Sequence, residues 1–400
     1  SLFLIINYIM SKNNSKNNKV LLFSCFNHVI SDLYFAVMYP LLPYIAITYE
    51  LSYTQTGLIK TVFDSGAALI QFPAGLLSDT ISEFWLIGIA NVWVGIGIVL
   101  MSLATSNNIF MLIAFFTGLG GGVQHPVGSR FISRHTDSNK LFTAIGTLNF
   151  SGDIGKIIAP IIVALIAVSY GWQTCLFFIG VTGIPLTIAS IFINKSISKK
   201  TKNNEDIQQN KSIINNTKII SHVDSQFILL MLAGFCDSIV RTATLTFIPF
   251  VFITKGMSTL KTSLIFTLLY SGGALGKFSS GWLSDKYNPF NIIAGTKLLV
   301  CILIPVILFC NITIGTILIF ILGIGLNGTS SVLYGIVAKI SSPETRGKSY
   351  GIYYTSTEVG VAVAPVLFGF MADTYSLNFS MIGISIISLL VIFLSIKIRS

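Results

Sequence analysis

Four pairs of ionisable residues sit at helical spacing inside long apolar runs of this 400-residue chain, and three of them are candidates for chemistry. Residues three or four apart share one face of a helix and can touch. A charge at the centre of a bilayer costs about 2.5–3.5 kcal/mol on insertion scales, so charges retained there indicate a role in moving protons or in binding a charged solute. These three pairs are His28 with Asp32, Asp153 with Lys156, and Asp237 with Arg241.

The composition excludes a soluble enzyme. Hydrophobic residues make up 53% of the chain, charged residues only 10%, and the mean hydropathy is +0.79. A soluble domain carries roughly 25% charged residues, so lipid must be the solvent here. The five cysteines are odd in number and scattered, which argues against a disulfide framework or a metal site. We expect no enzyme activity and no cofactor, and without a G-x-x-x-x-G-K-[ST] loop the energy source should be an ion gradient.

Twelve apolar segments are long enough to cross a bilayer, which needs about twenty residues per helix. They predict an all-α membrane protein of twelve transmembrane helices in two pseudo-symmetric six-helix bundles, residues 19–194 and 222–400, joined by a polar cytoplasmic linker over 195–221. Residues 1–18 form an N-terminal tail, in which Met10 is the expected true start. The segments are 20–47, 54–78, 84–104, 109–132, 140–168, 172–194, 224–253, 260–284, 290–311, 313–338, 347–372 and 376–396.

The cations in the loops predict the orientation of the chain. With the N-terminus in the cytoplasm, nearly all Lys and Arg of the loops and tails fall on the cytoplasmic side, and the opposite side holds Lys255 and Lys261. The positive-inside rule therefore predicts a multi-pass protein of the cytoplasmic (inner) membrane with both termini in the cytoplasm. The net charge of +10 follows from this topology, so we expect no nucleic-acid partner.

The two halves of the chain repeat each other. At an offset of 206, residues 65–79 and 271–285 agree at nine of fifteen positions, and Pro43 meets Pro249. At an offset of 205, glycines of the fourth and fifth segments match glycines of the tenth and eleventh. Parallel six-helix repeats are one of the symmetry patterns of secondary transporters.

Each copy of the repeated segment ends in G-x-L-S-D. This ending resembles the gating-loop signature of the major facilitator superfamily, and the resemblance covers the whole chain. The first copy departs from the signature, because residues 80–84 lack the usual basic residues. The loop residues that correspond are Gly75, Asp79, Gly281 and Asp285. The stretches 28–32, 39–42, 71–73 and 124–130 further resemble the fosmidomycin-resistance-type branch of the superfamily.

The resemblance implies that the first, fourth, seventh and tenth helices line a central cavity, flanked by the second, fifth, eighth and eleventh. A carboxylate in a partly dehydrated cavity could load and release a proton as access alternates, and Asp32 beside His28 is the first candidate. Cations there could attract an anionic substrate. The expected proton-coupling residues are Asp32, His28, Asp153, Asp237 and Glu358, and the expected substrate-binding residues are Gln124, His125, Asn149, Lys156, Arg241 and Tyr354.

Other buried charges also have structural interpretations. Lys60 and Asp64 are four residues apart in the second segment, where a neutralising pair is favoured. Lys277 and Lys297 could extend their amino groups towards the membrane surface or act in the cavity, and both interpretations stay open.

The sequence favours a secondary active transporter that works by alternating access as a monomer and couples protons to the export of a small anionic or amphipathic compound, as in antiport-based drug resistance. The alternative is import of an organic anion, a carboxylate or phosphate ester, by proton symport or exchange. A third interpretation is a transporter-shaped receptor that moves nothing. The expected partners are the small-molecule substrate, protons and the lipid bilayer.

Overall fold

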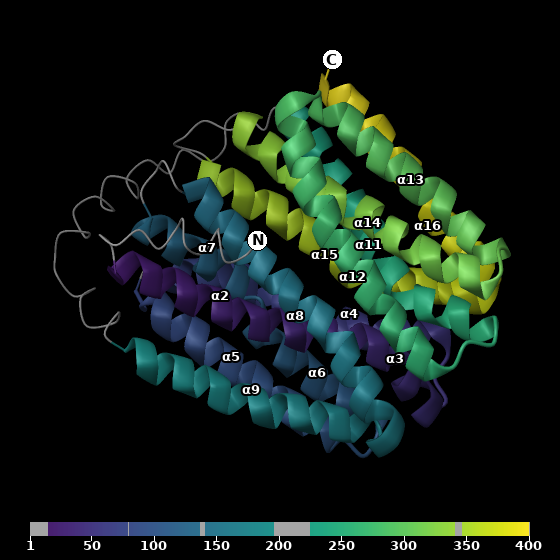
Figure 1. Cartoon of the computed structure of the whole chain (residues 1–400), viewed down its shortest axis with the longest axis horizontal. Helices are drawn as coiled ribbons and strands as arrows, with labels where there is room; N and C mark the ends of the chain where they lie inside the picture. Colours follow the sequence, from purple (N-terminus) through teal and green to yellow (C-terminus); the bar gives the residue numbers. More distant parts are fainter. Residues whose placement is uncertain (1–14, 79, 137–140, 196–224, 341–345, 400) are drawn as a thin grey trace.

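The computed structural model describes residues 15–78, 80–136, 141–195, 225–340 and 346–399, which form α-helices joined by short turns (Figure 1). The helices of the N-terminal half are α2 (Ser15–Ala36), α3 (Met38–Thr48), α4 (Tyr53–Leu77), α5 (Glu83–Ser102), α6 (Asn107–Gly121), α7 (Gln124–His135), α8 (Leu141–Tyr170) and α9 (Trp172–Asn194). Those of the C-terminal half are α11 (Ser225–Thr254), α12 (Thr259–Lys286), α13 (Pro289–Phe309), α14 (Ile312–Ile340), α15 (Arg346–Thr374) and α16 (Leu377–Arg399).

These helices confirm the predicted fold of two six-helix bundles. α2 and α3 together make the first crossing, α6 and α7 together make the fourth, and each remaining helix makes one. Ten of the twelve crossings are long and apolar enough to span a membrane. The exceptions are α4 and α12, whose Lys60, Asp64 and Lys277 are sheltered in ion pairs. The predicted linker, apart from Lys195, and most of the predicted tail lie outside the described residues.

Close helix contacts recur in both halves at the offsets found in the sequence. Gly118 of α6 lies against the carbonyl oxygen of Phe63 in α4, and Gly323 of α14 lies against that of Leu269 in α12. A β-carbon at either position would overlap the oxygen, so only glycine permits the approach. The repeat is therefore a repeat of packing as well as of sequence. Further equivalent contacts are Gly66 with Phe115 and Gly272 with Phe320, and Gly155 with Val29 and Gly360 with Phe235.

The fourth crossing is broken where three glycines precede a proline. α6 ends at Gly121 and α7 begins at Gln124. Pro126 has no backbone N–H, so the carbonyl four residues earlier, on Gly122, has no helical partner and the helix is interrupted, as a mid-span proline predicts. The interruption places His125 in the first turn of α7, with its ring towards His28 of α2.

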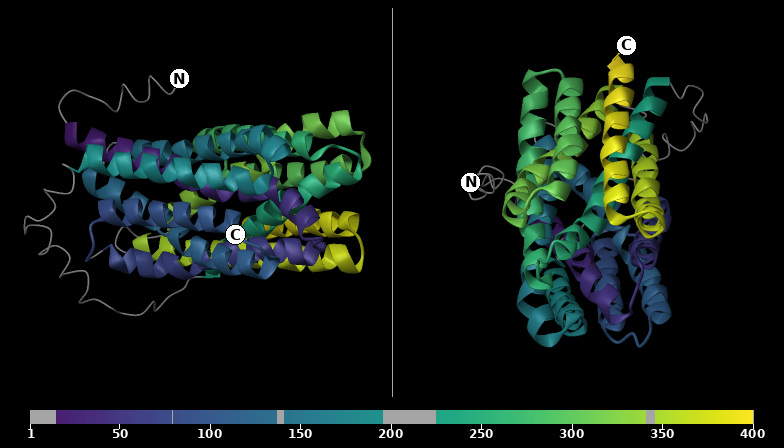
Figure 2. Two further views of the ribbon diagram at one scale, coloured as in Figure 1. Left: turned by 90° about the horizontal axis from the view of Figure 1, so that it is seen from below. Right: turned by 90° about the vertical axis from the view of Figure 1, so that its right-hand side faces the viewer.

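The two halves converge at one end of the molecule and diverge at the other. In Figure 1 the N-terminal half, purple to teal, and the C-terminal half, green to yellow, meet at the right, where α3, α4, α11 and α12 lie together. The beginning of α2 and the end of α16 lie at the diverging end. The right-hand view of Figure 2 shows the C-terminal half above the N-terminal half.

A carboxylate of one half caps a helix of the other at the converged end. Asp373, exposed near the end of α15, accepts hydrogen bonds from the backbone N–H groups of Tyr53 (2.9 Å) and Thr54 (2.8 Å) and from the Thr54 hydroxyl (2.5 Å). These donors begin α4, where the unpaired N–H groups and the helix dipole favour an anion. Gly57 and Gly369 allow the two backbones to approach closely here. The converged end is thus held closed by specific contacts.

Replacing Asp373 with Ala should favour conformations in which this end is open. We expect a population shift of roughly tenfold, the equivalent of one charge-assisted hydrogen bond. Spin labels on the exposed positions Ile47 and Tyr375, in a background without the native cysteines, report the separation of the two halves in double electron–electron resonance. Glu50→Gln, at an exposed acid of the same end, is the control. An unchanged distance distribution in Asp373→Ala would contradict the capping role.

Candidate functional site

A network of five ionisable side chains runs from α2 through α8 to α12. The Lys156 amino group lies 2.9 Å from Asp32 Oδ2 and 3.5 Å from Asp153 Oδ1. Lys277 Nζ, from the other half of the molecule, lies 2.5 Å from Asp153 Oδ1. His28 Nε2 lies 3.6 Å from Asp32 Oδ1. Both carboxylates and His28 are buried, whereas the side chains of Lys156 and Lys277 are 30% and 24% exposed, so the protein covers the lysine end of the network only in part.

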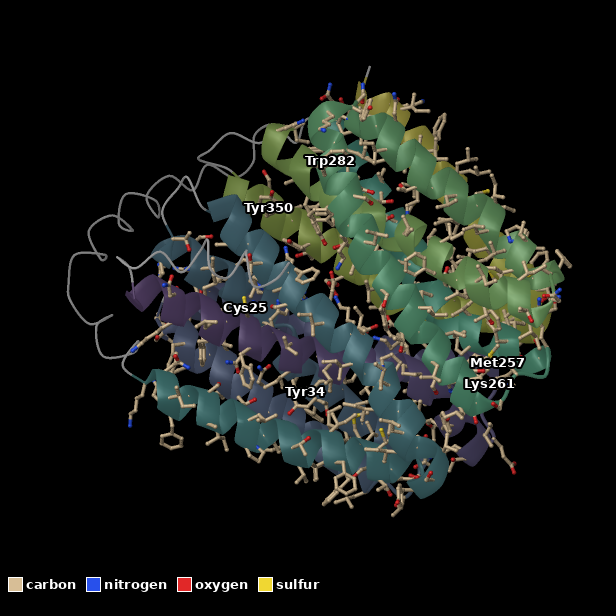
Figure 3. All side chains as sticks on the ribbon, viewed as in Figure 1. Cys25, Tyr34, Met257, Lys261, Trp282 and Tyr350 are labelled. Carbon is tan, nitrogen blue, oxygen red and sulfur yellow. The ribbon has the colours of Figure 1, made fainter. Side chains whose placement is uncertain are left out.

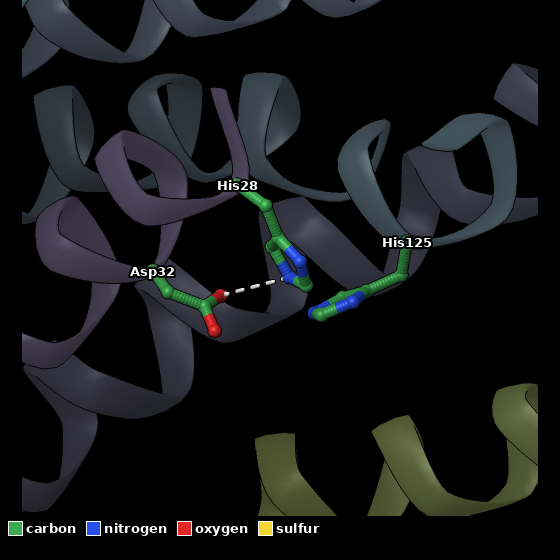
Figure 4. Close-up of side chains that lie close together, drawn as sticks. All are labelled: His28, Asp32 and His125. Atoms are coloured by element: carbon green, nitrogen blue, oxygen red, sulfur yellow. Dashed lines mark ion pairs between the residues drawn. The ribbon is translucent and has the colours of Figure 1, made fainter. Parts of the chain in front are cut away.

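His28 is held by a main-chain contact. Its Nδ1 lies 2.8 Å from the carbonyl oxygen of Leu148 in α8, and its ring lies edge-on to that of His125 with centroids 5.2 Å apart. Figure 4 shows both rings beside the Asp32 carboxylate. His125 is exposed even though it faces His28, so the protein does not cover this cluster on the His125 side.

A second contact between the halves lies at the equivalent place in the repeat. Glu358 of α15 lies close to the Gln71 side chain of α4. The offsets of 205 and 206 relate Glu358 to Asp153 and Lys277 to Gln71. The two contacts are therefore copies of one another, one built from an ion pair and one from an amide and a carboxyl group.

The sequence spacing is wrong about the partner of Asp237. Its carboxylate lies 2.5 Å from the amino group of Lys297 on α13, a side chain with no exposed surface. Arg241, half-buried, makes no ion pair within 4 Å with any described carboxylate. The charges of Asp237 and Glu358 act on it from a greater distance, together with the hydroxyl groups of Tyr334 and Tyr39. Arg241 is thus the cation best placed to accept an external anion.

Aromatic rings lie beside Arg241 in the C-terminal half. The rings of Tyr334 and Tyr354 have centroids 5.2 Å apart, and those of Tyr350 and Tyr354 are stacked at 6.1 Å. The Tyr350 hydroxyl, at the diverging end in Figure 3, donates to the carbonyl oxygen of Tyr334. All three tyrosines are half-buried, and Tyr334 is the one that lies in the surroundings of Arg241.

The remaining predicted residues are placed less distinctively. Gln124 is buried, and neither polar atom of its side chain has a hydrogen-bond partner among the described residues. Asn149 is exposed on α8. A β-carbon on Gly75 or Gly281 would meet nothing within 4 Å, so both glycines lie in open surroundings. Asp79 and the side chain of Asp285 lie outside the described part of the chain.

Two lysines that sequence reasoning left open have carboxylate partners in the structure. Lys277 pairs with Asp153 and Lys297 with Asp237, so neither simply extends to the membrane surface. Gln71 belongs to the stretch 71–73 that resembles the family branch, and the alignment of the halves places it opposite Lys277. The Lys60 and Asp64 side chains pair as expected, and Lys60 also lies over the ring of Tyr39 at 4.5 Å.

The arrangement can exchange protons and bind an anion at separate places. Asp32 and Asp153 share Lys156, and His28 faces Asp32, so a proton added to one of these groups changes the balance of charge on the others. Arg241 with its neighbouring tyrosines supplies a fixed positive charge and apolar ring faces. No described contact joins these two groups of residues directly, and both lie where the halves meet.

Removing Asp153 should destabilise the protein more than removing Lys277. Asp153→Asn leaves two lysines facing one remaining carboxylate, whereas Lys277→Gln leaves Asp153 paired with Lys156. We expect a loss of about 1–3 kcal/mol for Asp153→Asn and less for Lys277→Gln, since unpaired buried charges are costly. The unfolding midpoint of the purified protein measures both.

The double variant separates pairing from packing. Asp153→Asn with Lys277→Gln should be more stable than Asp153→Asn alone, because one lysine charge has been removed with the carboxylate. Lys261→Gln, an exposed lysine on the same helix, is the matched control (Figure 3). Strictly additive losses would show that no charge pairing joins α8 to α12.

Comparisons with known proteins agree with the fold. The sequence profile of the Major Facilitator Superfamily matches residues 24–332 and 230–399. An uncharacterized MFS-type transporter of Methanocaldococcus jannaschii is 23% identical over 338 residues, covering 84% of this chain and 86% of that protein. The fosmidomycin resistance protein of Escherichia coli is 26% identical over 153 residues, 38% of this chain and 37% of that protein, which supports the branch resemblance only weakly.

The fold also matches solved transporter structures. A bacterial homolog of the human lysosomal transporter Spinster superposes with a TM-score of 0.81 at 16% identity, covering 97% of both chains. The nucleoside transporter NupG superposes with a TM-score of 0.74 at 13% identity, covering 96% of this chain and 100% of that one. These relatives are transporters rather than enzymes, and this multi-pass membrane protein belongs to the Major Facilitator Superfamily.

Proposed function

We propose that this transporter works by alternating access and couples the inward movement of protons to the export of a small organic anion. The network His28, Asp32, Lys156, Asp153 and Lys277 is the observation that carries the proposal. It combines groups that can exchange protons with a contact that joins the two halves. Such a network would link the protonation state of its residues to the distance between the two halves.

The coupling step follows from the pairing of Asp153. A proton on its carboxylate cancels the charge that holds Lys277, so the contact between α8 and α12 weakens. Losing that proton restores the ion pair. A proton moving through 100 mV releases about 2.3 kcal/mol, which corresponds to somewhat under two powers of ten in substrate ratio. One proton per cycle is therefore enough for useful export.

Arg241 supports an anion as the substrate. It is a half-buried cation without a close carboxylate partner among the described residues, and the tyrosines beside it can pack against an organic group. Two relatives are named for organic anions: a probable galactarate/D-glucarate transporter of Escherichia coli and a 4-hydroxybenzoate transporter of Pseudomonas putida. Gln124, His125, Asn149 and Lys156 are proposed to complete the binding surface.

Import of an organic anion is the second candidate. The names of the same two relatives give an organic anion as the substrate and no direction, whereas the local match to the fosmidomycin resistance protein favours export. We place the protein in the cytoplasmic membrane as a monomer with both termini in the cytoplasm. Two observations support this orientation: both ends of the described chain lie at one end of the bundle, and the loop cations gather on that side.

Proteoliposomes with an imposed pH gradient test direction and coupling together. The probes are labelled 4-hydroxybenzoate, galactarate and fosmidomycin, with a pH-sensitive dye inside the vesicles. Export by exchange predicts probe accumulation in inside-out vesicles that are acidic inside, with loss of the proton gradient. Accumulation in right-side-out vesicles driven by external acid would instead establish import.

Two substitutions separate coupling from binding. Asp32→Asn should abolish gradient-driven accumulation and leave probe counterflow, which needs no net proton movement, within about threefold of the unmodified protein. Arg241→Gln should raise the KM for an anionic probe by about tenfold or more, since a bond to a charged group is lost. Glu50→Gln is the control for both. If Asp32→Asn still accumulates the probe, proton coupling through this network is wrong, and if no variant moves any probe, the receptor interpretation gains support.

A further inference from the structure

Beyond transport of an organic anion, we propose that His28, Asp32 and His125 bind one divalent transition-metal ion of the Zn²⁺ type (Figure 4). Each residue offers one ligand atom, and these atoms lie within 4.8 Å of one another. Imidazole nitrogens and carboxylate oxygens are ligands that Zn²⁺ takes in proteins, often three from the protein with a fourth position left for water or a solute. The three residues match that set.

Two structural elements bring the ligands together. His28 and Asp32 are four residues apart on α2 and therefore project from one face of the helix. His125 reaches them from the first turn of α7, directly after the interruption of the fourth crossing. The helix break at Pro126 thus places His125 beside the other two ligands.

The backbone orients His28 as a ligand. The Leu148 carbonyl can only accept, so the Nδ1 atom 2.8 Å away carries the hydrogen and the Nε2 atom of a neutral ring presents its lone pair. Nε2 is buried, has no hydrogen-bond partner among the described residues, and faces Asp32 Oδ1 at 3.6 Å. Two acceptors that face each other repel, and a cation between them is stabilised. A main-chain carbonyl behind the ring is a common outer support of metal-bound histidines.

Gly152 of α8 lets these side chains pack against the helix backbone. A β-carbon at this position would overlap the Asp32 Oδ2 atom and would lie 2.9 Å from Asp32 Cγ and 3.0 Å from His28 Nε2. The missing side chain therefore lets two of the three ligands lie directly against α8. His125 is exposed, so the protein leaves the ligands uncovered on that side.

Lys156 limits the affinity without blocking the site. Its amino group pairs with Asp32 Oδ2, which leaves Oδ1 facing His28, and Asp153 gives the lysine a second carboxylate. The positive charge repels a divalent ion at short range. Metal binding should therefore become tighter when this charge is removed.

Calorimetric titration of ZnCl₂ into the purified full-length protein, with any affinity tag removed, tests the site. We expect one Zn²⁺ per chain, and at least about tenfold weaker binding in His28→Gln and in His125→Gln. Even the loss of an outer-shell partner typically weakens metal binding by that factor. His135→Gln, at the other histidine of α7, is the matched control and should bind as the unmodified protein does. The Co²⁺ absorption spectrum reports whether the coordination is tetrahedral.

Two further substitutions test the space and the charge. Gly152→Ala should weaken binding at least about tenfold while every ligand is retained, whereas Gly146→Ala on the same helix, with nothing within 4 Å of its β-carbon, should not. Lys156→Gln should tighten binding. The unfolding midpoint of each variant identifies loss of folding.

Absence of binding to the folded protein, or equal binding in the His28 and His125 variants, would overturn the proposal. Because the titration needs neither substrate nor a gradient, its failure would leave the proposed transport function untouched. Conversely, failure of proton-coupled transport in vesicles would leave the titration result standing.

Discussion

The pairing of charges that have left water is the interaction on which the centre of this protein depends. An unpaired charge in a low-dielectric interior is far less stable than a paired one. Asp153 finds one partner on its own helix, Lys156, and another in the opposite half, Lys277. The same bonds that neutralise the carboxylate therefore join two bundles that are otherwise held by apolar packing and by the contacts of the converged end.

The internal repeat explains where these contacts lie, and the differences between its copies explain what they can do. Glycines at equivalent positions bring equivalent helices together in each half, as Gly118 and Gly323 show. The copies differ in charge: the position of Lys277 is occupied in the other half by Gln71. An amide does not exchange protons near neutral pH, so Glu358 is the titratable member of the contact with Gln71, whereas the contact of Lys277 with Asp153 is an ion pair.

Much of the fold could be predicted because its signals are local. Apolar length predicts each crossing, and helical spacing predicts the contacts of His28 with Asp32 and of Asp153 with Lys156, which the structure contains. The same rule is wrong for Asp237. Its partner, Lys297, comes from α13, and spacing along one helix carries no information about side chains that approach from another.

By itself, the sequence determined that this protein lies in a lipid bilayer, how many times it crosses the bilayer, and that the crossings are duplicated. It also determined which types of charge lie inside the crossings, since composition and periodicity record these features directly. Only the tertiary structure decided which charges meet. It paired Asp153 with Lys277, freed Arg241 from Asp237, and brought His125 across a broken helix to His28. The physical reason is that charge pairing acts over a few ångströms, and helix packing alone sets which distant residues come that close.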